Sequence, residues 1–188
     1  KKPVVIIVKD GTYREQAEVN WPGAETLPPL TITSQNLHGA IFTGSEPVSS
    51  NIEWVRNMNK EQGGWTATPP LHPDQWFYSP GGNPLDNPPP VITVNGNRLI
   101  HLPVLPPQAN GLYKFGVGSV VVAPPEEVTD LNTAQVRVST RKFALKIEGG
   151  GNITITNLNL TDYPIPSPNN SPGILHNGNV QVIGCKFE

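Results

Sequence analysis

Short stretches in which apolar and polar residues alternate recur along the chain, and each predicts a β-strand with one buried face. Turn-forming pairs such as Asp10-Gly11 and Pro22-Gly23 separate the first of these stretches. The first stretch, Val4–Val8, is apolar throughout and is therefore expected to be a buried strand. The expected strands span residues 4–8, 16–21, 30–34, 40–42, 91–100 as a hairpin, 112–115, 119–122, 135–139, 142–148, 153–160 and 180–187. The pattern predicts an all-β protein.

The strongest internal feature is a repeat near the C-terminus. Residues 152–160 can be laid over residues 179–187 without a gap, at an offset of 27 positions. In both segments the alternation changes phase at one residue, Asn157 or Gly184, and both residue types adopt left-handed backbone conformations at low cost. A repeat of this length made of short strands predicts a solenoid in which each repeat is one coil of a parallel β-helix. The alternative is a pair of similar hairpin strands in a sandwich.

Asparagines gather at the predicted corners of these coils. Successive coils of such a solenoid lie about 4.8 Å apart, so side chains at equivalent positions stack into ladders. Stacked amides hydrogen-bond along the ladder and satisfy buried backbone groups. The residues expected to have this structural role are Asn157, Asn159, Asn177 and Asn179. Cys185 stands where the preceding repeat has Leu158, so we expect it to be a small, inward-facing apolar residue.

The pattern changes between residues 46 and 140. This part contains most of the 22 prolines, and proline runs cannot lie within a central strand. Asn95-Gly96 between two alternating stretches nevertheless predicts a tight hairpin. We therefore expect first coils in residues 1–45, a β-rich, proline-rich insertion in residues 46–140, and further coils in residues 141–188. The insertion could also be a separate domain.

Composition and charge argue against several classes of protein. The 13 basic and 15 acidic residues give a net charge of −2, which argues against nucleic-acid binding because that requires a concentrated positive field. No apolar run approaches the roughly 18 residues that cross a bilayer, so no membrane span is expected. A disulfide scaffold is excluded because the chain has a single cysteine.

A family resemblance rests on the segment Ile-Val-Lys-Asp-Gly-Thr-Tyr-Arg-Glu at residues 7–15, with residues 30–33, residues 41–45 and Trp54 after it. These segments resemble the N-terminal part of right-handed parallel β-helix proteins, the pectin-lyase-like proteins. Further segments that share the resemblance are residues 94–96, 111–113, 136–140 and 151–155. The resemblance implies right-handed coils, with an inserted β-domain that separates the first coil from the main stack.

Many proteins of this family are polysaccharide lyases, epimerases or glycoside hydrolases. Their catalytic groups come from the middle coils, so the resemblance carries no catalytic residue over to this chain, and its catalytic residues are unknown. Whether the chain is an enzyme stays open. Basic residues near the predicted coils are expected to be solvated surface charges, namely Arg14, Arg137, Arg141, Lys142, Lys146 and Lys186.

Aromatic residues in the insertion are the candidates for carbohydrate binding. Trp65, Trp76 and Tyr78 could form a platform on which sugar rings stack, with Asp74 as a neighbouring polar group. The alternative is that these rings fill the core of the insertion. The adjacent residues Glu126 and Glu127 face opposite sides of an extended chain, so they are expected to be loop charges.

No metal site is predicted. The chain has four histidines, His38, His72, His101 and His176. Their spacing is not that of metal ligands. Asp10, Glu148 and Asp162 stand at predicted strand ends and carry the hard oxygens that calcium prefers, but they form no regular acidic loop. We expect no cofactor, with calcium as the weaker alternative.

Two functions from different classes follow. The first is an extracellular or cell-surface carbohydrate-active protein of the polysaccharide lyase or hydrolase kind, of which this chain is a non-catalytic N-terminal portion. The second is a non-enzymatic structural or adhesive protein. Its open strand edges, residues 4–8 and 180–187, would join copies head to tail into a filament.

Overall fold

The computed structural model describes residues 2–22, 27–57, 64–68, 70, 89–106, 109–116, 119–164 and 173–188. Within these residues the chain is all-β, with one short 3-10 helix, η2 (Leu131–Thr133). The contacts divide the chain into two units. We call Lys1–Gly44 with Arg141–Glu188 the coil unit, and Ser45–Thr140 the inserted unit. No helix among the described residues has the length and apolar character needed to cross a bilayer.

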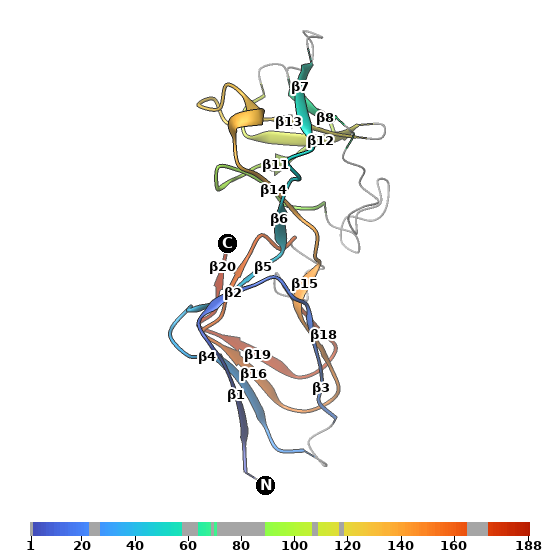
Figure 1. The fold of residues 1–188 in the computed structure, drawn as a ribbon. Coiled ribbons are helices and arrows are strands. Elements are labelled where there is room, and N and C mark those ends of the chain that lie inside the picture. The colour runs from blue at the N-terminus through green and yellow to red at the C-terminus, as the bar shows by residue number, and fades with distance from the viewer. Residues whose placement is uncertain are drawn as a thin grey trace. The chain divides into compact units, whose positions relative to one another are not determined.

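The coil unit is built from three sheets whose strands are all parallel (Figure 1). Sheet 1 has the order β1-β4-β16-β19, made of Val4–Val8, Leu30–Ser34, Ile153–Thr156 and Val180–Ile183. Sheet 2 has the order β2-β5-β17-β20, made of Gly11–Tyr13, Ala40–Thr43, Asn159–Thr161 and Lys186–Phe187. Sheet 3 has the order β3-β15-β18, made of Ala17–Asn20, Phe143–Glu148 and Gly173–His176. Successive strands of the coil unit belong to sheet 1, sheet 2 and sheet 3 in turn. Each set of three strands forms one coil, which stacks on the coil before it.

The predicted repeat is present in the strand register. Ile153 pairs with Val180 and Leu160 pairs with Phe187, which is the predicted offset of 27 positions. The phase changes at Asn157 and Gly184 are left-handed corners, with φ of 62° and 61°. The hairpin alternative is wrong, because the two copies pair in parallel. The right hand of the coil stays a prediction.

The inserted unit interrupts the second coil. It follows β5 of sheet 2 and precedes β15 of sheet 3, whereas the family resemblance implies an insertion after the first coil. The two ends of the insertion pair with each other, because Ser45 on β6 (Ser45–Pro47) lies opposite Ser139 on β14 (Val136–Ser139). The chain thus leaves and re-enters the coil at neighbouring points, and the stacking of β16 on β4 is undisturbed.

The core of the coil unit lies inside the three sheets. Buried and less buried residues alternate along β4 and β16, and Leu158 and Tyr163 add buried side chains from outside the strands. The buried residues of this core are Leu30, Ile32, Ala40, Phe42, Ala144, Leu145, Ile147, Ile153, Ile155, Leu158, Leu160, Tyr163 and Ile174. The expectation that Val4–Val8 is buried is wrong, since Val5 is 56% and Ile7 is 62% exposed. Val5 and Ile7 stand opposite Thr31 and Thr33 on the outward face of sheet 1, whereas Val4 and Ile6 stand opposite the buried Leu30 and Ile32. Val4 and Ile6 are still 36% and 44% exposed, because β1 is an edge strand of sheet 1.

The inserted unit consists of two sheets with a core between them. Sheet 4 has the order β10-β9-β14-β6, made of Asn97–Arg98, Ile92–Val94, Val136–Ser139 and Ser45–Pro47. Sheet 5 has the order β11-β12-β13-β8-β7, made of Ile100–His101, Leu112–Gly116, Ser119–Ala123, Gly64–Thr68 and Glu53–Asn57. Buried side chains from both sheets meet, among them Val94 and Val138 of sheet 4 and Trp54 and Val122 of sheet 5. The hairpin predicted at Asn95-Gly96 is confirmed, because β9 and β10 are antiparallel on either side of it.

Candidate functional site

Of the three aromatic residues predicted to bind carbohydrate, Trp65 is the one that the structure describes. It lies on β8 and is half-buried. Part of its ring packs against the core of the inserted unit, so the alternative of a core residue is partly correct. Trp76, Tyr78 and the neighbouring Asp74 lie outside the described residues.

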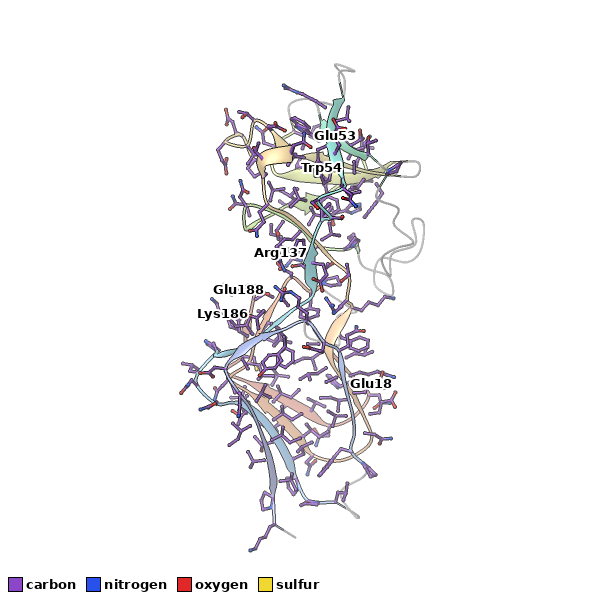
Figure 2. All side chains as sticks on the ribbon, viewed as in Figure 1. Glu18, Glu53, Trp54, Arg137, Lys186 and Glu188 are labelled. Atoms are coloured by element: carbon purple, nitrogen blue, oxygen red, sulfur yellow. The ribbon has the colours of Figure 1, made fainter. Side chains whose placement is uncertain are left out.

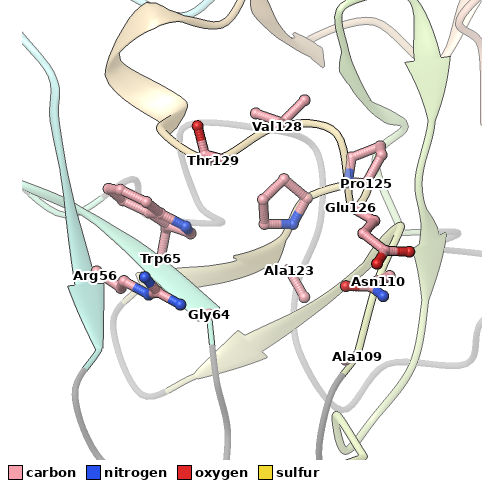
Figure 3. A pocket seen from close by; sticks show the side chains of 11 residues that line it. Arg56, Gly64, Trp65, Ala109, Asn110, Ala123, Pro125, Glu126, Val128 and Thr129 are labelled. Atoms are coloured by element: carbon pink, nitrogen blue, oxygen red, sulfur yellow. The ribbon is translucent and has the colours of Figure 1, made fainter.

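Trp65 lines a cleft of about 290 Å³ in the inserted unit. Figure 3 shows Trp65 and Arg56 side by side on one wall, and Glu126 beside Asn110 across from them. Pro124 and Pro125 also line the cleft. The cleft therefore combines an aromatic ring, a guanidinium, a carboxylate and an amide in a small space.

The pairing of β7 with β8 positions the two side chains of the first wall, Arg56 and Trp65. Arg56 on β7 lies directly opposite Trp65 on the antiparallel strand β8. Side chains of directly opposite residues lie on the same face of a sheet, a few ångströms apart. Because part of the indole ring is packed into the core, Trp65 presents its remaining surface to the cleft in a fixed orientation.

The second wall is held by hydrogen bonds around η2. The backbone N–H of Val128 donates to the carbonyl oxygen of Pro125 at 2.9 Å, which closes a turn that contains Glu126. Asn132 then joins this segment to β7: its Oδ1 accepts from the Trp54 backbone nitrogen at 2.7 Å, and its Nδ2 donates to the Trp54 carbonyl oxygen at 2.9 Å. The same strand therefore carries Arg56 on one wall and anchors the segment that forms the other.

The two charges in the cleft are available to a ligand. Within the described part of the chain, neither Arg56 nor Glu126 has a recorded ion pair or hydrogen bond. The sequence predicts Glu126 to be a loop charge, and no motif in it points to Arg56 or Asn110. Only the strand pairing and the turn bring these residues to Trp65, so no local pattern in the sequence could have identified them.

Asn157, Asn177 and Asn179 lie at coil corners and Asn159 lies on β17, and each of the four has a different partner. Asn157 has a left-handed backbone, and its carbonyl accepts from the backbone nitrogen of His38 at 2.8 Å. Asn177 accepts from the Gly149 backbone nitrogen through Oδ1 at 3.2 Å. Asn179 donates through Nδ2 to Oδ1 of Asn152 at 2.7 Å, which is an amide pair between equivalent positions of neighbouring coils.

Asn159 differs from the other three because its side chain is 8% exposed, on sheet 2. Its Nδ2 donates to a carboxylate oxygen of Glu188 at 3.3 Å, while its buried Oδ1 has no recorded partner. The four asparagines thus occupy different positions around the coil, and the structure does not stack them on one another. Their contacts are between coils, and none faces the cleft of the inserted unit.

Charged residues on the outside of the coil unit form exposed ion pairs. The Lys146 ammonium lies 3.0 Å from Glu148 and 3.5 Å from Glu18, and the hydrogen bond with Glu148 raises the pKa of Lys146. Lys186 lies 2.6 Å from Glu188 (Figure 2), and this hydrogen bond lowers the pKa of the Glu188 carboxyl. Exposed pairs of this kind contribute little to stability, as expected for solvated surface charges.

The described residues offer no group of three or more histidine, cysteine, aspartate or glutamate side chains that could hold a metal ion. Two of the calcium candidates are engaged elsewhere: Asp10 accepts from the backbone nitrogen of Asn36 at 3.2 Å, and Glu148 pairs with Lys146. Calcium binding stays a prediction. Cys185 packs against the core of the coil unit, and burial raises the pKa of its thiol.

No protein-family model and no curated protein sequence matches this chain. Among solved structures, "The complex structure of XylC with xylose" matches with a TM-score of 0.56 over 88% of this chain. The likeness supports a β-helix fold. Sequence identity over the match is 16%, so the likeness concerns the fold alone. The chain spans 31% of the length of XylC, which bound xylose in that structure.

Proposed function

We propose that this chain is the N-terminal portion of an extracellular or cell-surface carbohydrate-active protein, and that its inserted unit binds a sugar residue of a polysaccharide at Trp65. The observation that carries the proposal is the half-buried Trp65 on the wall of a cleft that also contains Arg56, Asn110 and Glu126. An aromatic ring stacks on the apolar face of a sugar, while charged and amide side chains hydrogen-bond its hydroxyl groups.

The proposal assigns binding, not catalysis, to the described residues. Glu126 is the only carboxylate among the described residues that line the cleft, whereas glycoside hydrolysis ordinarily needs two carboxyl groups at a set separation. The likeness to XylC supports a carbohydrate-active protein because xylose was bound to a structure of similar fold.

Substitution of Trp65 tests this function. We expect Trp65→Ala to weaken the binding of the full chain to xylotriose, or to an acidic xylo-oligosaccharide, at least tenfold, which corresponds to about 1.4 kcal/mol. Isothermal titration calorimetry measures the dissociation constants. Trp65→Phe retains a ring and should keep part of the affinity, and circular dichroism verifies that both variants are folded. Equal affinity of the wild type and Trp65→Ala, or no binding of any oligosaccharide, would contradict the proposal.

Self-assembly is the second candidate, and the exposed apolar side chains of the outer strands favour it. Val5 and Ile7 on β1 are 56% and 62% exposed, and Ile183 on β19 is 54% exposed. β1 and β19 are the two edges of sheet 1, and each has a row of backbone groups that another strand can pair with. Pairing of β1 in one copy with β19 in the next would repeat without closure and form a filament.

If the copies assemble in this way, the mass of the wild type measured by light scattering should rise steeply with concentration. Ile7→Lys should lower that mass, because a lysine on an edge strand opposes strand pairing. Leu37→Lys is the matched control, since Leu37 is 70% exposed but lies outside the strands. A monomer at all concentrations excludes the filament and leaves the carbohydrate-binding proposal intact.

A further inference from the structure

Three asparagines of the chain, Asn95, Asn110 and Asn177, are followed directly by glycine, and such pairs can undergo deamidation. In this reaction the backbone nitrogen of the glycine attacks Cγ of the asparagine. Glycine favours the attack because it has no side chain to hinder its nitrogen and restricts the backbone least. The asparagine side chain and the following peptide must turn toward each other, so contacts that fix either of them slow the reaction.

Two of these asparagines are held by hydrogen bonds to distant parts of the chain. The backbone nitrogen of Asn95, in the turn between β9 and β10, donates to the carbonyl oxygen of Gln135 at 2.9 Å. Its Oδ1 accepts from the Gln135 backbone nitrogen at 2.8 Å. The backbone nitrogen of Asn177 donates to the carbonyl oxygen of Ile147 at 3.3 Å, and its Oδ1 accepts from the Gly149 backbone nitrogen. Reaction at either asparagine would break these contacts.

Asn110 differs from the other two. It is exposed, belongs to no strand or helix, and has no recorded hydrogen bond within the described part of the chain. The following Gly111 has a φ of 65°, and an added Cβ there would meet no atom within 4 Å. The carbonyl oxygen of Gly111 accepts from the Ile100 backbone nitrogen at 2.9 Å, which leaves the attacking nitrogen of Gly111 unconstrained by that contact.

We propose that Asn110 is a site of deamidation in the folded protein. The backbone nitrogen of Gly111 forms a bond with Cγ of Asn110, the bond from Cγ to Nδ2 breaks, and ammonia leaves with the proton of the Gly111 N–H group. The product is a five-membered cyclic imide. Water then adds to one of its two carbonyl groups and opens the ring, which gives aspartate or isoaspartate. Water is the only other reactant.

This modification changes the charge of the cleft. Arg56 and Glu126 are the charged residues that line it, and their formal charges cancel. Figure 3 shows Asn110 beside Glu126, across the cleft from Arg56. A carboxylate in place of the amide gives the lining a net negative charge and puts two carboxylates on one wall, so the modified cleft disfavours anions. The inference is independent of the ligand that the unmodified cleft binds.

Incubation of the full chain at mildly alkaline pH tests this, with peptide mapping by mass spectrometry to follow the aspartate and isoaspartate products at each site. The same protein unfolded in urea is the reference, because there all three asparagines precede glycine without tertiary contacts. We expect similar rates at the three sites in urea. In the folded chain Asn95 and Asn177 should react roughly tenfold more slowly than in urea, whereas the rate at Asn110 should fall by about threefold at most.

Asn110→Gln supplies a second readout. The longer side chain would have to close a less favourable six-membered ring, so the acidic form of the folded protein should appear more slowly in isoelectric focusing. Asn51→Gln is the matched control, because Asn51 is an exposed asparagine of the same unit that precedes an isoleucine, and it should leave that rate unchanged. Equal slowing of all three sites on folding, or an unchanged rate in Asn110→Gln, would overturn the inference.

Discussion

Gly149→Ala is expected to destabilise the protein by about 3 to 5 kcal/mol, because the new methyl group has no space. Gly149 has a φ of 113°, in the region that favours glycine, at the corner that follows β15. An ideal Cβ at this position would lie 2.1 Å from the carbonyl oxygen and 2.6 Å from the carbonyl carbon of Trp21. Both atoms belong to the backbone of the preceding coil, so the clash is relieved only if the stacked coils separate.

The control for this substitution is Gly184→Asn. Gly184 also has a positive φ, of 61°, but an added Cβ there would meet only the side-chain oxygen of Asn157, at 3.0 Å. The equivalent corner of the preceding coil already carries an asparagine with the same backbone conformation. We expect a cost of about 1 kcal/mol or less. Chemical denaturation followed by circular dichroism measures both free energies of unfolding, and equal values would contradict the predicted contact between the coils.

Ile155→Ala is expected to lower the free energy of unfolding by about 2 to 5 kcal/mol. Ile155 is fully buried inside the coil unit, where it pairs with Ile32 on one side and Val182 on the other. Truncation removes three side-chain carbon atoms from the middle of this stack and leaves a cavity. The strands on either side are hydrogen-bonded at a fixed spacing, so they cannot move together to fill it.

Ile183→Ala is the matched control for Ile155→Ala. Both isoleucines lie in sheet 1, but Ile183 points outward and is 54% exposed. Its truncation removes little buried surface, so we expect a change of about 0.5 kcal/mol or less. Thermal unfolding monitored by calorimetry measures both variants. A similar shift of the melting temperature for the two variants would contradict the assignment of the inward and outward faces.

The position of the cleft could not be predicted from the sequence, although its aromatic residue could. Trp65 is conspicuous in a proline-rich segment, but Arg56 and Glu126 are ordinary surface charges in the sequence. They become part of one site because β7 pairs with β8 and because Asn132 ties η2 to β7. Arg56 and Trp65 lie on consecutive strands, but the contact of Asn132 with Trp54 joins residues 78 positions apart, and a pattern of neighbouring residues carries no information about it.

The expectation that Val4–Val8 is buried failed for a similar reason, because burial depends on the position of a strand in the sheet. An apolar run predicts a strand, but its burial depends on whether another strand lies beside it. β1 lies at the edge of sheet 1, so its inward-facing Val4 and Ile6 are incompletely covered, and Val5 and Ile7 face outward. Which coil the insertion interrupts also depended on tertiary contacts, since only the sheet order shows that β5 before it and β15 after it belong to the same coil.

The sequence by itself determined most strands of the coil unit, the left-handed corners at Asn157 and Gly184, and the 27-residue step between the last two coils, but it did not predict β2, β7, β8 or β18. These features follow from side-chain alternation and from the backbone preferences of asparagine and glycine, which act over a few residues. Only the tertiary structure decided which strands are covered, where the insertion interrupts the coil, and which charges accompany Trp65. Those outcomes depend on hydrogen-bonded pairing between distant segments, which forms only when the whole chain folds.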